Sequence, residues 1–346
     1  MTYKEIASKL NISASSLSIV INHKPGVSQA TRERVIAQLK EMNLGHLLKD
    51  KSTPASQSLC FIIYKRDGKI LDLHPFFLLL MENIENRART FGYSVLLCTV
   101  DKRRPIEPQI AYINELQAQG AILFGTEMDN DDILYFKELD LPFVILDNDF
   151  TRLDLDTVSI NNQMGTYQAV EYLAEKGHKR IGYLKSKIRI SSFKERHQGY
   201  EQALAHFHLG FLPEDIWTVG YTEEESYRDI SRLLNASALS LPSAFVCDDD
   251  TIALGAMRAF KEQGYQIPGQ LSVIGFNDRP ACELADPPLT SVSVSKLTWA
   301  TETVDALIRL MESKKNPPAE IRSKKIRIGT KLIIRSSVWD LPETDA

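Results

Sequence analysis

The sequence predicts an N-terminal all-α helix-turn-helix domain followed by an α/β body, in which two doubly wound parallel-sheet lobes hold a ligand cleft between them. Three observations carry this prediction. Helical periodicity recurs in three short runs before residue 43, a stretch containing Gly, Ser and Pro follows, and from residue 59 apolar runs of strand length alternate with helical stretches. At 346 residues the chain has room for two or three folding units.

Three helices are predicted in the head. Thr2 and Glu5 form a capping box for a helix over residues 3–10. Ser13 and Ser28 are suitable N-caps for a second and a third helix. The Pro-Gly pair within the run NHKPG ends the second helix.

The second predicted helix carries short hydroxylated side chains. Leu17, Val20 and Ile21 form its inward face, and its other side consists of Ala14, Ser15, Ser16, Ser18 and Ile19. A short turn before such a helix describes a helix-turn-helix whose second helix enters the major groove of DNA. Hydrophobic spacing alone fits a small helical packing module equally well.

Composition narrows the class of protein. Hydrophobic residues make up 43% of the chain and charged residues 25%, as in an ordinary globular protein. Residues 1–50 hold seven Lys and Arg against four acids, a net +3 that leaves −7 for the rest of a chain of net charge −4. A basic head on an acidic body fits phosphate binding at one end.

The expected compartment is the cytoplasm. The four cysteines stand singly in apolar runs, which indicates buried thiols rather than a disulfide framework. We find no signal peptide and no run of about 18 uncharged apolar residues, so no membrane contact is predicted.

The head resembles a known family. The stretch KEIASKLNISASSLSIVINHKPGVSQATRERVIAQL is similar to the N-terminal DNA-binding domain of the lactose-repressor (LacI) family, whose pattern is IA..L..S..T.S.V.N....VS..TR..V. The resemblance implies a homodimer that reads a palindromic operator without a cofactor. It also implies DNA contacts from Thr2, Ser13, Ala14, Ser15, Ser16, Ser18, Ile19, Asn22, His23 and Lys24.

Two departures from the family pattern bear on DNA contacts. Where the family commonly has an arginine after the recognition serine, this chain has Ile19, which offers only apolar contact, for example to a thymine methyl group. In place of the family's Tyr-x-Pro-Asn run and Ala-Arg-x-Leu hinge helix, residues 43–58 read NLGHLLKDKSTPASQS, which is typical of a flexible tether. Leu47 and Leu48 remain candidate minor-groove wedges.

Two series of buried strands are predicted in the body. They are LCFIIY (59–64), YSVLLC (93–98), AILFG (121–125) and FVILD (143–147), then TVSI (157–160), RIGYL (180–184), IWTVG (216–220), AFVC (244–247) and LSVIGF (271–276). Apolar strands joined by helical crossovers indicate parallel sheets covered on both faces, with ligand at the carboxyl ends of the strands. No GxGxxG, GxxxxGK[ST], HExxH or GxSxG motif is found, so no enzymatic activity is predicted.

The body is similar to the effector domain of the same family, which resembles periplasmic sugar-binding proteins. The matching stretches are HPFF (74–77), EYLAEKGHKRIGYL (171–184), ERHQGY (195–200), DDDTIALGAM (248–257), LSVIGFND (271–278) and DPPLTSVSV (286–294). The resemblance implies a DNA-binding domain over 1–43, a linker or degenerate hinge over 44–58 and an effector-binding and dimerisation domain over 59–340. Its lobes would comprise 59–160 with 291–323, and 162–290 with 324–340, crossing near Asn161, Ser291 and Lys324.

Effector contacts are also implied by the resemblance. Phe76 stands where the family places a side chain against the ligand ring, although a core phenylalanine is the alternative. Arg196 matches the family's effector-binding arginine, with a solvated helix arginine as the alternative. Acid and amide are exchanged at Asp249 and Asn277 relative to most relatives, and both types hydrogen-bond polyols. The implied set is His74, Phe76, Asp147, Arg196, Asp249 and Asn277.

Three consecutive acids, Asp248, Asp249 and Asp250, suggest a metal site as one interpretation. Successive side chains diverge, however, and acids suit a helix N-terminus, so no metal is predicted.

The leading hypothesis is a transcriptional repressor of carbohydrate-utilisation genes, whose operator affinity is controlled by a sugar or sugar phosphate bound between the lobes. One alternative is a cytosolic sugar-binding or carbohydrate-processing protein whose DNA-binding head is weak or lost. Another is a regulator that responds to a protein partner. The tail after Val338 has no heptads, which favours a dimer over a tetramer.

Overall fold

The computed structural model describes residues 3–21, 26–42, 44, 57–70, 76–236, 240–315 and 322–340. The chain divides into two compact units, residues 1–57 and 58–346, and each is considered by itself. Within the described ranges, no helix combines the length and the apolar character that crossing a membrane requires.

The first unit contains the three predicted helices, α1 (Tyr3–Lys9), α2 (Ala14–Ile21) and α3 (Gln29–Glu41). The Ser13 hydroxyl accepts the backbone N–H of Ser16 at 3.0 Å, which confirms this residue as an N-cap. Ser28 accepts the N–H of Thr31 at 3.2 Å in the same way. The small core of this unit consists of Ile6, Ala7, Leu10, Leu17, Val20, Ile21, Val35 and Leu39.

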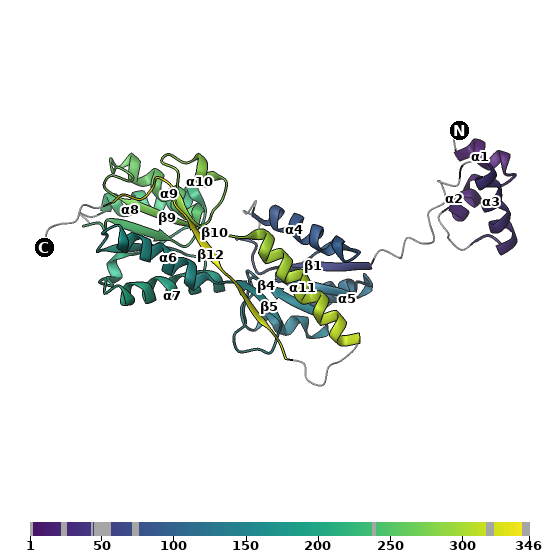
Figure 1. The fold of residues 1–346 in the computed structure, drawn as a ribbon, viewed down its shortest axis with the longest axis horizontal. Helices are drawn as coiled ribbons and strands as arrows, with labels where there is room; N and C mark the ends of the chain where they lie inside the picture. The colour runs from purple at the N-terminus through teal and green to yellow at the C-terminus, as the bar shows by residue number, and fades with distance from the viewer. Residues whose placement is uncertain are drawn as a thin grey trace. The chain divides into compact units, whose positions relative to one another are not determined.

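The second unit begins with a lobe built on a six-stranded sheet of order β11-β5-β4-β3-β1-β2. Its strands are β1 (Gln57–Lys65), β2 (Tyr93–Asp101), β3 (Gly120–Phe124), β4 (Phe143–Leu146), β5 (Thr157–Ile160) and β11 (Lys325–Ile328). The pairings of β1 with β3, β3 with β4, β4 with β5 and β5 with β11 are parallel. Apolar side chains pack one face against α4 (Phe76–Thr90) and α11 (Lys296–Lys315), and the other against α5 (Glu107–Glu115) and the 3-10 helix η3 (Asp132–Glu138) (Figure 1).

The second lobe repeats this architecture with the sheet order β12-β10-β9-β8-β6-β7. Its strands are β6 (Ile181–Ser186), β7 (Ile216–Val219), β8 (Ala244–Cys247), β9 (Ser272–Asn277), β10 (Thr290–Val294) and β12 (Thr330–Ile333), of which β12 runs antiparallel to β10. One face is covered by α6 (Asn162–Glu175) and α7 (Ser191–His206), and the other by α8 (Glu223–Ala236) and α9 (Asp250–Glu262). Two short helices, η4 (Pro213–Asp215) and α10 (Ala281–Leu284), complete the lobe.

All nine predicted strands are present, and β10, β11 and β12 were missed. Their sequences TSVSV, KIRI and TKLI mix polar and apolar residues. β11 and β12 lie at sheet edges and are only partly covered, so they lack the continuous apolar run on which the prediction depended. β10 is mostly buried, but its sequence alternates Ser or Thr with Val.

The chain passes between the lobes three times, at Asn161, Ser295 and Gly329. The sequence predicts the second and third crossings near Ser291 and Lys324, a few residues earlier. The difference arises because residues 290–294 complete the second sheet beside β9, while residues 325–328 join β5 in the first sheet.

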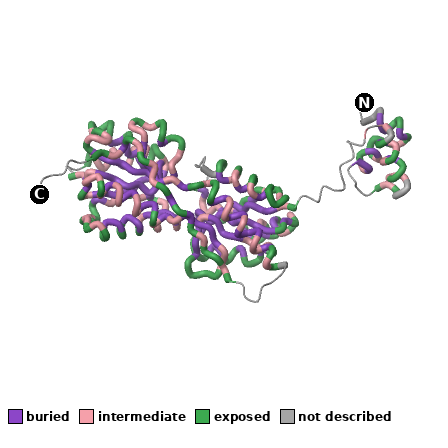
Figure 2. The backbone as a smooth tube through the Cα atoms, in the orientation of Figure 1, coloured by how far each residue is buried: buried purple, intermediate pink, exposed green. Residues whose placement is uncertain are grey.

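One apolar core continues through both lobes. The inner strands of both sheets are buried along most of their length, whereas the edge strands β2, β11 and β12 and the outer faces of the helices are more exposed (Figure 2). The largest cluster of buried side chains includes Phe61 and Phe124 of the first lobe and Tyr183, Tyr200 and Phe276 of the second. This continuous core fixes the strand ends that form the site described next.

Candidate ligand-binding site

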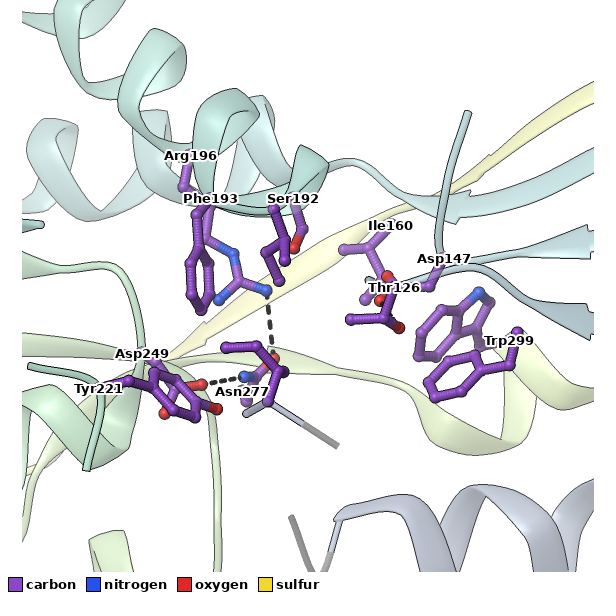
Figure 3. Close-up of a pocket in the computed structure, with 13 residues that line it drawn as sticks. Thr126, Asp147, Ile160, Ser192, Phe193, Arg196, Tyr221, Asp249, Asn277 and Trp299 are labelled. Carbon is purple, nitrogen blue, oxygen red and sulfur yellow. Dashed lines mark hydrogen bonds between the residues drawn. The ribbon is translucent and has the colours of Figure 1, made fainter. Parts of the chain in front are cut away.

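A cavity lies between the two lobes, at the carboxyl ends of their parallel strands, where open α/β sheets bind ligands (Figure 3). It encloses about 490 Å³, including its opening to solvent. Four predicted effector positions line it together: Asp147, Arg196, Asp249 and Asn277. The other lining residues are Ile70, Phe124, Thr126, Ile160, Ile190, Ser192, Phe193, Tyr221 and Trp299.

Arg196 is buried on α7 and is held in three directions. Its Nε donates to Asn162 Oδ1 at 3.0 Å, and its Nη1 donates to the backbone carbonyl of Asp248 at 2.5 Å. Its Nη2 points at Asn277 Oδ1 across 3.5 Å (Figure 3). The guanidinium carbon also lies 3.7 Å from the ring centroid of Phe276, a cation–π contact. Since Arg196 is only 3% exposed, the alternative of a solvated helix arginine is wrong.

The exchanged acid and amide bond to each other. Asn277 Nδ2 donates to Asp249 Oδ2 at 2.6 Å (Figure 3), and Asp249 Oδ1 accepts the N–H of Thr251 and so caps α9. Asn277 ends β9 with φ of 103°, in the left-handed region that Asn tolerates better than most residues. An acid–amide hydrogen bond needs one residue of each type, so the exchanged order provides the same bond with its partners reversed.

Asp147 is the corresponding polar group of the first lobe. It follows β4 with φ of 70°, another left-handed position at the edge of the cavity. Thr126 Oγ1 donates to its Oδ2 at 2.6 Å. Burial raises the pKa of Asp147 to about 6, and the hydrogen bond from Thr126 opposes this rise. Asp147 therefore ionises near neutral pH, in a wall that also contains Phe124 and Ile160.

The three consecutive acids serve three different sets of partners. Asp248 accepts from Tyr183 Oη, from the N–H of Ser186 and from Arg189. Asp250 accepts from Ser291 Oγ at 2.6 Å, and burial raises its pKa to about 7. Because Asp249 faces the cavity instead, the three carboxylates do not converge on a point. Within the described part of the chain, no group of three or more His, Cys, Asp and Glu side chains is placed to hold a metal ion.

Comparison with known proteins covers both units. The family model for bacterial regulatory proteins of the lacI family matches residues 2–44, and the model for a periplasmic binding protein-like domain matches residues 170–338. The HTH-type transcriptional repressor CytR of Escherichia coli (strain K12) is 30% identical over 343 residues, which cover 99% of this chain and 97% of that protein. The chain belongs to the lacI family of bacterial regulatory proteins.

A second relative and a solved structure are also similar to this chain. The HTH-type transcriptional repressor PurR of Haemophilus influenzae (strain PittEE) is 27% identical over 341 residues, 97% of this chain and 98% of that protein. The solved Lac repressor dimer bound to operator and the anti-inducer ONPF has a TM-score of 0.71 at 23% identity, over 98% of this chain and 99% of that one. This LacI-family chain is therefore a DNA-binding transcriptional regulator with an effector-binding domain, rather than a sugar-binding protein whose head is lost.

On the head of this LacI-family regulator, α2 has the predicted two-sided character. Leu17, Val20 and Ile21 are buried, which confirms the inward face. The other side is exposed at Ser13, Ala14, Ser15 and Ser18, and partly exposed at Ser16 and Ile19. The Ser13 hydroxyl also lies 2.8 Å from the hydroxyls of Ser15 and Ser16. Contact of these side chains with DNA stays a prediction.

Several predicted positions lie outside the described residues. They are Thr2, Asn22, His23 and Lys24 of the head, the candidate wedges Leu47 and Leu48, and His74 of the body. Phe76 is the first residue of α4, and its side chain is likewise outside the described part.

Sequence reasoning missed most of the apolar wall of the cavity. Phe124, Thr126 and Tyr221 end or follow strands β3 and β7, so the rule that ligands bind at the carboxyl ends of strands identifies them once the strands are known. Ile190, Ser192 and Phe193 lie at the start of α7, one turn before Arg196. Ile70, in an irregular segment, and Trp299, within α11, carry no comparable signal.

Proposed function

We propose that this chain represses carbohydrate-utilisation genes in the cytoplasm, with its operator affinity controlled by a small sugar-like ligand bound between the two lobes. One observation carries the proposal: polar groups from both lobes face a single cavity. Asp147 comes from the first lobe, whereas Arg196 and Asp249 come from the second. A ligand that contacts both lobes binds one lobe arrangement better than another and shifts the population toward it.

The chemistry of the cavity supports a sugar-like ligand. Carboxylates at Asp147 and Asp249 accept from hydroxyl groups, and the amide of Asn277 can accept and donate. Aromatic side chains such as Phe193 and Trp299 offer flat apolar surfaces on which a sugar ring packs. Four of the six predicted effector positions thus supply hydrogen-bonding groups around an apolar space.

A homodimer accounts for exposed apolar side chains on the first lobe. Leu78 and Leu79 of α4 are 72% and 49% exposed, and Leu97 of the edge strand β2 is 58% exposed. Because α4 packs on β2, these leucines lie on neighbouring elements, and exposed apolar groups of this kind mark interaction surfaces. A second copy there would bring two heads to the half-sites of a palindromic operator.

Titration of the full-length protein with promoter DNA from its own gene neighbourhood tests the proposal. We expect a preferred palindromic site, a steep loss of affinity with salt, and a change in affinity when an effector sugar is added. Equal binding of all DNA fragments at every salt concentration would rule out the proposed repressor function. An operator affinity that no sugar alters would rule out only its control by a ligand.

Substitution of Ile19 by Arg tests the orientation of α2. If Ile19 faces the major groove, the new guanidinium can bond guanine and should shift the preferred operator sequence by about 1–3 kcal/mol per altered base pair. Site selection from a randomised DNA library measures the preference. Exposed Arg34 of α3, changed to Ile, is the control for general charge effects. An unchanged motif in the Ile19→Arg variant would show that Ile19 faces away from the bases.

A further inference from the structure

The charges that face the cavity are mainly negative. Asp147 and Asp249 contribute one carboxylate from each lobe. Among the described lining residues, Arg196 is the one Lys or Arg. An anionic ligand would therefore meet two carboxylates and one guanidinium.

The guanidinium of Arg196 is already engaged by the protein. A phosphate group is usually held by two parallel N–H bonds, from Nε with Nη2 or from Nη1 with Nη2. Nε and Nη1 donate instead to Asn162 and to the backbone carbonyl of Asp248, at 3.0 and 2.5 Å. Two aromatic rings also pack against the guanidinium, because Phe276 and Phe193 have their ring centroids 3.7 and 5.3 Å from its central carbon. Nη2 points one N–H at Asn277 Oδ1 across 3.5 Å, so its other N–H is left for a ligand.

The neighbouring cations are also committed to protein groups. Arg189 pairs with Asp248, and Arg279 bonds the hydroxyl of Thr251. Lys296 donates to the backbone carbonyl of Asn277 at 3.2 Å. These residues do not line the cavity, so they offset the buried acids beneath its surface rather than attract a ligand.

The carboxylate of Asp147 needs a donor from outside the protein. Among the described residues, one hydroxyl, that of Thr126, bonds to it, although an ionised carboxylate can accept about four hydrogen bonds. The rest of this wall is apolar, with Phe124 and Ile160 only 4% and 2% exposed. A hydroxyl of the ligand satisfies Asp147, whereas a phosphate oxygen, which carries further negative charge, cannot.

We propose that the effector is an uncharged, polyhydroxylated ring of monosaccharide size, and that the cavity excludes the phosphate ester of the same sugar. The inference rests on the proposed function, because it takes this cavity to be the effector site. The ligand donates hydroxyl hydrogens to Asp147 in the first lobe and to Asp249 in the second, and accepts from the Nη2 edge of Arg196. The ring packs between the aromatic walls of the cavity.

Matched pairs of free and phosphorylated sugars test the proposal on the full-length protein. The probes are glucose with glucose 6-phosphate, fructose with fructose 6-phosphate, ribose with ribose 5-phosphate, and galactose with galactose 1-phosphate. Thermal unfolding identifies stabilising members, and calorimetric titration gives their dissociation constants. We expect at least one free sugar to raise the Tm and its phosphate ester to bind at least about tenfold more weakly. Equal or tighter binding of an ester, or no stabilisation by any free sugar, overturns the proposal.

Removal of one carboxylate sharpens the test. Asp249→Asn should weaken binding of the stabilising free sugar by about tenfold, because a charged acceptor is replaced by a neutral one. It should also narrow the gap between sugar and ester, because one repulsive charge is lost. Asp147→Asn gives the same test from the first lobe if the first variant does not fold. The matched control is Asp140→Asn, an exposed acid outside the cavity, which should leave both affinities unchanged. An undiminished gap in both cavity variants overturns the proposal.

Operator titration of the same samples separates this inference from the proposed function. If a sugar phosphate binds in the cavity and changes operator affinity, the protein is controlled by a ligand as proposed, but the cavity does not exclude anions. If a free sugar raises the Tm but leaves operator affinity unchanged, the cavity binds the proposed class of ligand, but that ligand does not regulate DNA binding.

Discussion

The two lobes share one sheet architecture but present unlike faces to the cavity. In the second lobe, Arg196, Asp249 and Asn277 are bonded to one another or to neighbouring backbone before any ligand arrives. In the first lobe, Asp147 has one described donor, Thr126, and stands beside Phe124 and apolar neighbours. The second face is thus organised in advance to orient a ligand. The first face offers a carboxylate that can accept further hydrogen bonds from a ligand.

Breaking the frame of the second lobe should have the largest effect. A Cβ added at Gly199 would lie 2.3 Å from the carbonyl oxygen of Gln163 and 2.8 Å from its Cα, so Gly199→Ala must push α7 away from α6. We expect the free energy of unfolding in urea to fall by about 3 kcal/mol, at the upper end of the range for overpacking. Gly210→Ala is the control, because no atom lies within 4 Å of its added Cβ. Equal losses in the two variants would contradict this account of the α6–α7 contact.

Arg196→Lys removes the guanidinium group of the second lobe's cavity face while keeping its positive charge. An ammonium group cannot reach Asn162 and the Asp248 carbonyl in the fork geometry of arginine, so buried acceptors lose their donor. We expect a loss of about 2 kcal/mol in the free energy of unfolding. Calorimetric titration should also find binding of the stabilising sugar abolished. Arg228→Lys, at an exposed surface pair, should change stability by less than about 0.5 kcal/mol, and a similar loss there would refute the role of the buried fork.

In the first lobe, substitution of the cavity carboxylate should raise the free energy of unfolding rather than lower it. Burial raises the pKa of Asp147 from 3.8 to about 6, so the folded state binds its proton more tightly than the unfolded state. The stability of the native protein therefore falls as pH rises from about 4 to about 6, and stays lower above that. Asp147→Asn has no such titration and keeps an acceptor for Thr126. At about 1.4 kcal/mol per pKa unit, and with allowance for solvent in the cavity, we expect a gain of about 2 kcal/mol at pH 8.

Urea unfolding at pH 8 and pH 4 measures this gain. The gain should shrink to a small fraction of its pH 8 value at pH 4, where Asp147 is protonated in the folded state and about half protonated in the unfolded state. Asp140→Asn should show no comparable dependence, because Asp140 is exposed. A gain of equal size at both pH values would show that ionisation of Asp147 is not its cause.

The same contrast explains what the sequence could predict. Asp147, Asp249 and Asn277 stand at strand ends, where apolar runs give way to polar residues, so local pattern agrees with the positions that the resemblance implied. Arg196 was found by resemblance. Ile70 and Trp299 reach the cavity through tertiary structure alone, and no local pattern marks them.

Ile70 illustrates why such positions escape prediction. The buried carboxylate of Glu127 accepts the backbone N–H groups of Arg66, Asp67, Gly68 and Ile70, at 2.9 to 3.2 Å. This long-range set of bonds shapes the segment after β1 and turns Ile70 into the apolar cluster of the second lobe. β11 and β12 were missed for a related reason, since both are short and partly polar and pair with strands far away in the sequence.

The smallest effect should come from the one described donor to Asp147. Thr126→Val keeps the branched shape and removes the hydroxyl that lies 2.6 Å from the carboxylate. Because that bond lowers the pKa of Asp147, the pKa should rise above about 6, and the free energy of unfolding should fall by about 1 kcal/mol at pH 8. Carbon-13 titration of the aspartate carboxyl measures the pKa, with Thr218→Val, an exposed strand residue, as the control. An unchanged pKa would show that the hydrogen bond from Thr126 does not stabilise the ionised form of Asp147. The polar group of the first lobe would then depend even less on protein partners than the groups of the second lobe do.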